Sequence, residues 1–408
     1  ADFKYIFKFI ANFKERKYKY MALKDFKKVL EKVSKDHAAS IVPANSNTLI
    51  NKLAFDSPQL TYMFGGFSYD RIHNLFGPES SGKSSSFCFL ASQLQKKIPK
   101  IKPEWKEKQV VIYMDFERTF DPEYAQRLGL NIDEDHFVLL QSDTLEEACA
   151  ITESLVKTGA VCCVILDSDA AAPTNLDAES EIGATGFNGA KAANTLKEVY
   201  KRFNVLCSNY KFPLLVVSQE RAQMDANSHA INSTGGRALR FFSSTRSRVQ
   251  KLDTIKRGDE TIGIQIRIRN YKNKTSIPFR DAIMDLYFDG GFDSTQEYFA
   301  FILNFGYIHR AGAWFDWTDR DNWAGEYDVE NNVPKTYKWQ GSAKVKEWLE
   351  QHQDVYSKFK ELVDAKLCVA NELDAGNTNP EEEGESTDEE KLSKLLEQKK
   401  EEEEILNS

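Results

Sequence analysis

Residues 77–84 carry the most specific chemical pattern in this sequence. They read Gly-Pro-Glu-Ser-Ser-Gly-Lys-Ser, which fits G-x-x-x-x-G-K-[ST]. Glycines allow a tight backbone turn in which successive N–H groups point at phosphate oxygens. In such a loop Lys83 reaches the terminal phosphates and the Ser84 hydroxyl ligates Mg²⁺. The predicted contacts to the nucleotide phosphates are Gly77, Pro78, Glu79, Ser80, Ser81, Gly82, Lys83, Ser84 and Ser85.

The segments on both sides of the loop support this interpretation. An apolar run at 72–76 predicts a short buried strand, and residues 85–95 have helical character. Strand, glycine loop and helix in this order are the context that a phosphate loop requires. The alternative is a glycine-serine turn that happens to contain lysine, and such a turn would need neither flank. The sequence therefore predicts a nucleotide-binding protein.

Three further strand ends carry groups suited to nucleotide hydrolysis. The strand predicted at 110–115 runs into Glu117, which could orient and deprotonate an attacking water. The alternative for Glu117 is an ordinary acid on a solvated loop. A long apolar run closes with Asp167, a candidate carboxylate on the Mg²⁺ side that acts through water. The strand at 214–219 ends in Gln219, whose amide could donate a hydrogen bond to a γ-phosphate.

Two lysines at alternate positions follow the strand predicted at 264–270. Lys272 and Lys274 share one strand face and could offer positive charge to phosphates. Taken alone, they are better explained as a solvated strand edge.

The alternation of short β-rich runs with helical patterns predicts an α/β fold. We expect a core at 51–295 with a central mixed, mainly parallel sheet and crossover helices. Residues 1–50 predict one or two basic amphipathic helices. Such a helix could lie on a membrane surface, but we favour a face that docks on a partner and expect this segment to serve oligomerisation. Residues 296–370 are rich in aromatic side chains and predict a small α+β domain, and 371–408 predict an acidic, disordered tail.

The net charge of −8 comes from one end of the chain. Between Glu381 and Glu404 there are 12 acidic residues and 4 lysines, so the remainder is formally neutral. Residues 1–37 carry 11 basic against 5 acidic residues. The negative balance therefore does not argue against a nucleic-acid partner.

The composition disfavours several other classes of protein. No apolar run approaches the roughly 20 residues of a membrane-spanning helix, and lysines interrupt the apolar start where a secretory signal would lie. The six cysteines show no metal-binding spacing, and adjacent Cys162 and Cys163 should point to opposite faces of a strand. We expect reduced, core-filling cysteines in a cytoplasmic protein with no membrane partner.

Further motifs follow the phosphate loop in a specific order. They are Asp115-Phe116-Glu117, Asp121-Pro122-Glu123-Tyr124-Ala125, Asp167-Ser168, Glu181-Ile182-Gly183, Ser218-Gln219-Glu220-Arg221, Thr234-Gly235-Gly236-Arg237-Ala238-Leu239-Arg240-Phe241, Lys272-Asn273-Lys274 and Ala311-Gly312-Ala313-Trp314. With this order and spacing, residues from about 57 to 317 resemble a RecA-type homologous recombinase of the bacterial form. The divergent ends suggest a bacteriophage-encoded or otherwise remote relative, and a bacteriophage protein would act in the cytoplasm of its bacterial host.

The resemblance implies a RecA-like P-loop ATPase core that uses ATP and Mg²⁺. It implies that Glu117 is the hydrolytic base and that Tyr124, together with Asp121, lies against the adenine. Gln219 would couple the γ-phosphate to a DNA-binding loop that begins beside it.

The resemblance also implies contacts between subunits. Lys272 and Lys274 would act in trans on the nucleotide that the adjacent subunit holds. Such an arrangement explains why ATP favours a helical homo-oligomeric filament, because phosphate charge at a subunit boundary is neutralised from both sides. Phe241 matches a position through which the family transmits the nucleotide state across the interface, and burial in the core is an equal alternative.

The resemblance implies that single-stranded DNA, the primary partner, binds at two loops, about 181–190 and 220–236. Double-stranded DNA is a further expected partner. Small and polar residues dominate both loops, as in segments that order on binding. In the second loop Glu220 and Asp225 weaken the positive potential, and the acidic tail is expected to compete with DNA for basic surface. The predicted DNA contacts are Lys191, Arg221, Met224, Thr234, Gly235, Gly236 and Arg237.

The resulting hypothesis is a DNA-dependent ATPase and recombinase. It would form helical filaments on single-stranded DNA and catalyse homologous pairing and strand exchange in recombination and repair. Two alternatives stay open: a hexameric RecA-fold helicase or motor, and a protein that coats single-stranded DNA with ATP as a switch but without strand exchange.

Overall fold

The computed structural model describes residues 51–179, 188–221, 232–233, 236–325, 327–328 and 333–374. The predicted N-terminal segment, most of the acidic tail and the central parts of both predicted DNA loops lie outside these residues. No helix in the described stretches is both long and apolar enough to cross a membrane.

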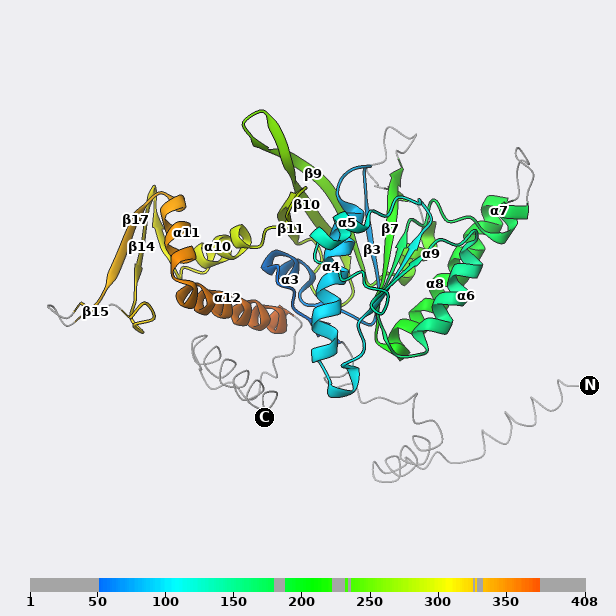
Figure 1. Cartoon of the computed structure of the whole chain (residues 1–408), viewed down its shortest axis with the longest axis horizontal. Helices are drawn as coiled ribbons and strands as arrows, with labels where there is room; N and C mark the ends of the chain where they lie inside the picture. The colour runs from blue at the N-terminus through cyan, green and yellow to red at the C-terminus, as the bar shows by residue number, and fades with distance from the viewer. Residues whose placement is uncertain are drawn as a thin grey trace, which may run out of the picture. The chain divides into compact units, whose positions relative to one another are not determined.

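Ten strands of the described residues form one mixed sheet (Figure 1). In spatial order they are β12 (Gly291–Phe292), β11 (Asp281–Tyr287), β10 (Glu260–Asn273), β9 (Thr245–Arg257), β3 (Ile72–Gly77), β7 (Leu214–Arg221), β6 (Val161–Asp167), β4 (Val110–Asp115) and β5 (Phe137–Leu140), with β8 (Asn232–Ser233) paired to β7. Neighbours from β9 to β5 are parallel, and the pairs from β9 to β12 are antiparallel. The predicted α/β fold with a mixed, mainly parallel sheet is therefore confirmed.

Helices cover both faces of this sheet. The helices of the described residues are α3 (Pro58–Phe64), α4 (Lys83–Lys97), α5 (Pro122–Arg127), α6 (Leu145–Val156), α7 (Asn175–Glu179), α8 (Asn188–Tyr210), α9 (Gly236–Phe242), α10 (Thr295–Asn304), α11 (Ser342–Gln351) and α12 (Gln353–Asp374), with short 3-10 helices η2 (Ile98–Lys100) and η3 (Pro103–Trp105). Along β4, Val111 and Tyr113 pack with the apolar residues of α4, whereas Ile112 and Met114 pack with those of α6 and α8 (Figure 1). Successive side chains of a strand point to opposite faces, so a strand covered on both sides must be apolar throughout.

The strands predicted from apolar runs are present. The runs at 110–115 and 161–167 match β4 and β6, those at 72–76 and 214–219 lie within β3 and β7, and the run at 264–270 is the middle of the longer β10. The predicted helix at 85–95 lies within α4.

One expectation about side-chain direction was wrong. Cys162 and Cys163 are both fully buried in the same apolar cluster on the α4 face. The pairing of β4 with β6 shifts register between Val110 and Val111, and Val111 pairs with Cys163. Such an irregularity interrupts the alternation of side chains. Both thiols are free, in line with the predicted role as core fillers.

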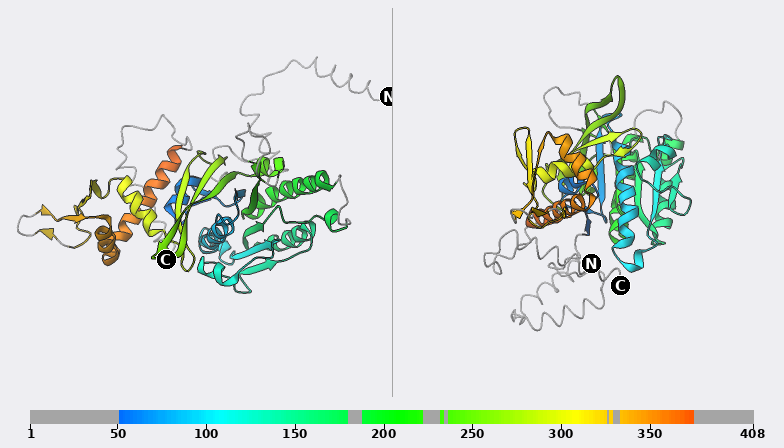
Figure 2. Two further views of the ribbon diagram at one scale, coloured as in Figure 1. Left: turned by 90° about the horizontal axis from the view of Figure 1, so that it is seen from above. Right: turned by 60° about the vertical axis from the view of Figure 1, so that its left-hand side comes forward.

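Strands β9 and β10 extend past the rest of the sheet as a hairpin (Figures 1 and 2). Strand β9 pairs with β3 only over residues 245–248, and β10 pairs with β11 only from Gly263 to Arg269. Beyond Arg248, β9 is therefore flanked only by β10, whereas β10 lies between β9 and β11 as far as Gly263, so that only the residues next to the turn form a two-stranded ribbon.

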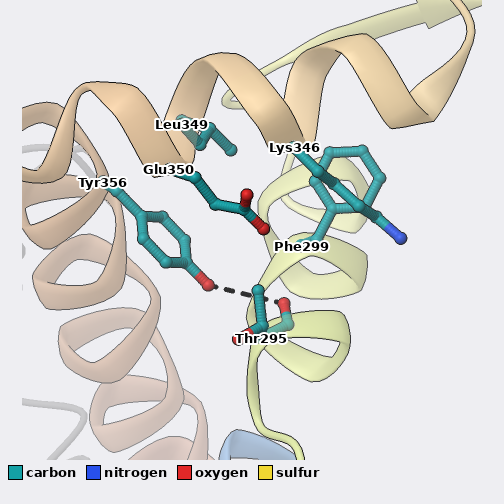
Figure 3. A pocket seen from close by; sticks show the side chains of 6 residues that line it. All are labelled: Thr295, Phe299, Lys346, Leu349, Glu350 and Tyr356. Atoms are coloured by element: carbon teal, nitrogen blue, oxygen red, sulfur yellow. Dashed lines mark hydrogen bonds between the residues drawn. The ribbon is translucent and has the colours of Figure 1, made fainter.

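A separate aromatic cluster is built from residues 298–367. Its strands are β13 (His309–Ala311), β14 (Trp314–Thr318) and β17 (Thr336–Gln340), and the remaining short pairs of the described chain are β15 (Tyr327–Asp328) with β16 (Val333–Pro334) and β1 (Lys52–Leu53) with β2 (Phe67–Ser68). Helices α10, α11 and α12 meet at a hollow of about 10 Å³, where the Tyr356 hydroxyl donates a 3.4 Å hydrogen bond to the Thr295 carbonyl (Figure 3). This hollow has room for about one water molecule, so it is a packing feature.

Candidate functional site

The carboxyl ends of the parallel strands bring the predicted catalytic groups to one cavity. Strands β3, β7, β6 and β4 are parallel neighbours, so the residues that follow them meet at one edge of the sheet. The cavity there has a volume of about 390 Å³. Its lining residues are Glu79, Ser80, Ser81, Gly82, Lys83, Ser84, Ser85, Glu117, Asp167, Val217 and Gln219.

The backbone of the loop requires glycine at two positions. A Cβ atom on Gly77 would lie 2.2 Å from the carbonyl oxygen of Val249 in β9, so only glycine permits this close approach. Gly82 has a φ of +88° and directly precedes α4, where the turn needs the left-handed conformation. The N-terminus of this 15-residue helix therefore points its free N–H groups at the loop, which suits an anion.

Lys83 lies folded over the loop. Its ammonium donates a 2.6 Å hydrogen bond to the Pro78 carbonyl, which also accepts a 2.8 Å hydrogen bond from the Ser81 hydroxyl. Burial lowers the pKa of Lys83, and the nearby carboxylates of Asp167 and Glu117 oppose that shift. The Lys83 ammonium therefore lies in a partly buried site with neighbouring carboxylates, in a position to contact a phosphate bound by the loop.

Asp167 is a buried carboxylate that contacts the first turn of α4. It accepts a 2.5 Å hydrogen bond from the Tyr113 hydroxyl and a further hydrogen bond from Ser84. Burial raises the pKa of Asp167, and these two hydrogen bonds oppose the shift. A hydroxyl and a carboxylate oxygen side by side are hard ligands that fit Mg²⁺. The residues predicted to hold the metal therefore lie together.

Glu117 lies at the mouth of the cavity with two hydrogen-bond donors. The Ser168 hydroxyl donates to Glu117 Oε1 at 2.5 Å, and the Gln219 amide nitrogen lies 3.5 Å from the same oxygen. Within the part of the chain that the structure describes, both donors contact Oε1 and leave the second oxygen to face another group, as a general base requires. The carboxylate that could act as a base and the amide that could sense a phosphate thus share one contact.

Ser168 and Tyr113 were not predicted as site residues. Ser168 directly follows Asp167, and the end of a strand beside a catalytic carboxylate is a signal that could have identified it. Tyr113 lies inside an apolar strand, and only the neighbouring position of β6 shows that its hydroxyl reaches Asp167.

The predicted adenine-side residues lie at the start of α5. Asp121 caps this helix by accepting a 3.1 Å hydrogen bond from the Tyr124 backbone N–H. The Tyr124 hydroxyl donates a 3.2 Å hydrogen bond to Ser85 in the first turn of α4. The aromatic ring and the phosphate loop are therefore held together.

Lys272 and Lys274 do not line this cavity in the described chain. Both ammonium groups bind carbonyls at the carboxyl end of α9: Lys272 contacts those of Arg240 and Phe241, and Lys274 donates a 2.9 Å hydrogen bond to Phe241. Cations are favourable at a helix carboxyl end. Burial, with repulsion from Lys274 and Arg246, lowers the pKa of Lys272 to about 8.

Phe241 is 70% exposed, so the interpretation of this residue as a core side chain was wrong. Its ring contacts Phe242 edge-on, and the Lys274 ammonium lies 5.6 Å from the ring centre. An exposed aromatic ring flanked by cations is a surface available to another molecule.

Only some of the predicted DNA contacts can be placed. Lys191 is exposed on α8, and Gly236 and Arg237 are exposed in the first turn of α9, where Gly236 has a φ of +61°. Arg221 is the last residue of β7. Met224, Thr234 and Gly235 lie outside the described residues.

The expected effect of Glu220 on the second loop needs correction. Arg248 of β9 donates two hydrogen bonds of 2.9 Å to the two carboxylate oxygens of Glu220. The negative charge is therefore compensated locally and does not weaken the potential of the loop as an unpaired carboxylate would.

An α/β sheet with a phosphate loop between β3 and α4 defines a P-loop nucleotide-binding protein. The model of the RecA N-terminal domain family matches residues 24–293. The chain is 31% identical to Protein RecA of Symbiobacterium thermophilum over 75% of this chain and 80% of that protein. It is 29% identical to Protein RecA of Rickettsia canadensis (74% and 80%) and 30% identical to that of Lactococcus lactis subsp. cremoris (78% and 76%).

The chain belongs to the RecA family, and the predicted resemblance to a RecA-type recombinase is confirmed. At family level this is a protein of DNA recombination and repair. A bacteriophage origin stays a prediction.

Proposed function

We propose that this protein is a DNA-dependent ATPase that assembles as a helical filament on single-stranded DNA and catalyses homologous pairing and strand exchange. The observation that carries the proposal is the meeting of the phosphate loop, Glu117, Asp167 and Gln219 in one cavity of a RecA-family chain. Base pairing would read the sequence of the DNA, while the protein holds its backbone. We propose that the protein acts in the bacterial cytoplasm.

In this mechanism the loop binds the ATP phosphates through its backbone N–H groups and Lys83. Ser84 and Asp167 would hold Mg²⁺, which neutralises charge on the phosphate oxygens. Glu117 accepts a proton from the attacking water, and the hydrogen bond from Ser168 fixes the orientation of its carboxylate. Tyr124 and Asp121 would contact the adenine.

Gln219 would link hydrolysis to DNA. Its side chain lies beside Glu117 in the cavity. Strand β7 ends at Arg221, within the first residues of the second predicted DNA loop. Arg221, Gly236 and Arg237 flank that loop, and Lys191 follows the first one. We propose that these groups, with Met224, Thr234 and Gly235, contact the single strand.

Lys272 and Lys274 would complete the site from a neighbouring subunit. They do not reach the cavity of their own chain, and they carry positive charge beside the exposed ring of Phe241. We retain the proposed division into a basic oligomerisation segment (1–50), a core (51–295), a small C-terminal domain (296–370) and an acidic tail (371–408).

The test measures phosphate release with and without single-stranded DNA for the wild type and for Glu117→Gln. We expect DNA to stimulate the wild type and the variant to lose roughly 10²–10⁴-fold in rate while it still binds ATP, because only the base is removed. Equal, negligible rates in both proteins would favour a coating protein that uses ATP as a switch.

Electron micrographs with single-stranded DNA and a slowly hydrolysed ATP analogue provide the second arm of this test. Open helical filaments support the proposal. Closed rings would favour a hexameric motor, and a well-folded protein that stays monomeric with both ligands would contradict both.

A further inference from the structure

A paired arginine and glutamate lie on the sheet face opposite the cavity. Glu220 follows Gln219 near the end of β7, and Arg248 lies in β9. Strand β3 runs between them, with Phe76 paired to Arg248 on one side and Gly77 paired to Gln219 on the other. The Arg248–Glu220 pair therefore crosses the end of β3 where the phosphate loop begins.

The geometry of the pair is rigid. The Nε and Nη2 atoms of Arg248 each donate a 2.9 Å hydrogen bond to a different oxygen of Glu220. The two side chains are only 19% and 20% exposed. Two parallel hydrogen bonds from a planar guanidinium fix direction as well as distance, and partial burial reduces screening by solvent.

Fixing Glu220 also fixes Gln219. Successive side chains of a strand point to opposite faces, so Val217 and Gln219 line the cavity while Glu220 points away from it. If β7 rotated or slid at Glu220, the Gln219 amide would leave its position 3.5 Å from Glu117. The Arg248–Glu220 pair thus restrains a cavity residue from the far side of the sheet.

The pair also holds the base of the second predicted DNA loop. Glu220 and Arg221 pair with Ser233 and Asn232 of β8, which closes that loop. Next to Arg248, the Val249 carbonyl lies against Gly77. One rigid segment of β9 therefore contacts both the start of the phosphate loop and the base of the DNA loop.

We propose that Arg248 and Glu220 are positioning residues that transmit DNA binding at the second loop to Gln219. The inference rests on the proposed DNA-dependent ATPase. Neither residue lines the cavity, and the Glu220 carboxylate acts on Lys83 through its charge alone, which raises the pKa of that lysine. Their role is to keep the end of β7 in register with β9, so that binding of DNA beside β8 moves Gln219 as one unit with the strand.

The experiment compares steady-state ATP hydrolysis of the full chain, with and without single-stranded DNA, for Arg248→Met, Glu220→Gln and the double variant. We expect DNA-stimulated kcat to fall by about tenfold or more, since small displacements of a positioned group have effects of that size. For Arg248→Met, DNA-independent kcat and KM for ATP should stay within about twofold, because the groups that line the cavity are unchanged. Glu220→Gln also removes a charge that acts on Lys83, so its KM for ATP is compared with that of Arg248→Met.

The double variant and a matched control separate positioning from mere stabilisation. If the two residues act as a pair, the DNA-stimulated kcat of the double variant equals that of the less active single variant. If they act independently, the two losses of kcat multiply. Arg202→Met serves as the control, because it removes the 2.5 Å ion pair with Glu153 on the surface of α8, away from the cavity lining. It should leave DNA stimulation unchanged at a similar thermal midpoint.

The outcomes also separate this inference from the function on which it rests. A wild-type protein without DNA-stimulated hydrolysis contradicts the proposed function, and the inference falls with it. Normal wild-type stimulation with unchanged stimulation in Arg248→Met overturns the positioning role alone. A loss of basal and stimulated rates in equal proportion, matched by a lower thermal midpoint, overturns it as well.

Discussion

The phosphate-loop cavity is rich in carboxylates, whereas the carboxyl end of α9 is surrounded by cations. The cavity combines carboxylates of Glu79, Glu117 and Asp167 with the ammonium of Lys83. At the end of α9, Lys272 and Lys274 lie near Arg246, and burial together with repulsion from Lys274 and Arg246 lowers the pKa of Lys272. In the proposed function the first region binds and activates the nucleotide, and the second supplies only positive charge.

In the proposed function, one chain lacks part of the positive charge that a bound triphosphate requires. A triphosphate in the cavity adds negative charge to a site already rich in carboxylates, and one lysine with a helix N-terminus balances only part of it. The cations at the end of α9 would supply the remainder if a second copy brought them to the cavity. Occupancy of the nucleotide site would then favour assembly.

The largest expected effect comes from breaking the cavity itself. Lys83→Ala should lower ATP hydrolysis by roughly 10²–10³-fold, as is typical when one charged group that stabilises the transition state is removed. It should also weaken ATP binding by isolated subunits, because Lys83 lies in the cavity that is proposed to bind ATP. Phosphate release and equilibrium titration with a fluorescent ATP analogue provide the measurement, and unchanged binding would contradict this assignment.

The next prediction concerns the cations at the carboxyl end of α9. Lys272→Ala should reduce DNA-dependent hydrolysis and the cooperativity of filament assembly together, by roughly 10–100-fold in rate. ATP binding by isolated subunits should remain nearly intact, because Lys272 lies outside the cavity of its own chain. Lys338→Ala, an exposed lysine of β17, is the matched control.

A mixture of two inactive variants tests whether Glu117 and Lys272 of different subunits form one site. In an equal mixture of Glu117→Gln and Lys272→Ala, about one quarter of random neighbour pairs combine an intact Glu117 with an intact Lys272, since a head-to-tail interface joins different surfaces of two copies. Hydrolysis should recover toward that fraction. A mixture as inactive as its components would show that both residues act within one chain.

A smaller effect concerns pH. Burial and neighbouring cations lower the pKa of Lys272 to about 8, so its charge is lost as the pH rises through that value. At limiting ATP, DNA-dependent hydrolysis should fall by up to roughly tenfold between about pH 7 and about pH 9, following the charged fraction. Lys272→Arg should flatten this decline, because a guanidinium stays protonated. An identical slope in both proteins would separate the pH dependence from Lys272.

The same pKa has a consequence for stability with a definite sign. The unfolded chain holds the Lys272 proton up to the ordinary value of 10.5, whereas the folded chain releases it near 8. Between these values the unfolded state binds more protons, so this group raises the free energy of unfolding as the pH increases. The Lys272→Arg variant should lack that contribution in urea titrations.

The smallest expected effect on the isolated subunit is that of Phe241→Ala. Because the ring is 70% exposed, its removal should change the free energy of unfolding by no more than about 0.5 kcal/mol. Filament assembly on single-stranded DNA, followed by light scattering, should nevertheless weaken. A large loss of stability without a change in assembly would return Phe241 to a structural role.

Much of the fold and half of the candidate site could be predicted from local patterns. The phosphate loop needs glycines at set positions, so its spacing is visible in the sequence. The strands before Glu117, Asp167 and Gln219 are apolar throughout, and the rule that parallel strands end at one edge brings these residues together. Each inference depends only on residues close together in the chain.

The tertiary structure decided everything that depends on which strands are neighbours. Because β9 lies beside β3, Arg248 reaches Glu220, and because β6 lies beside β4, Tyr113 reaches Asp167. The register shift that places Cys162 and Cys163 in one cluster, and the docking of Lys272 on α9, also join distant segments. Periodicity records how a strand faces its surroundings but not which strand lies next to it, so these contacts exist only once the sheet is assembled.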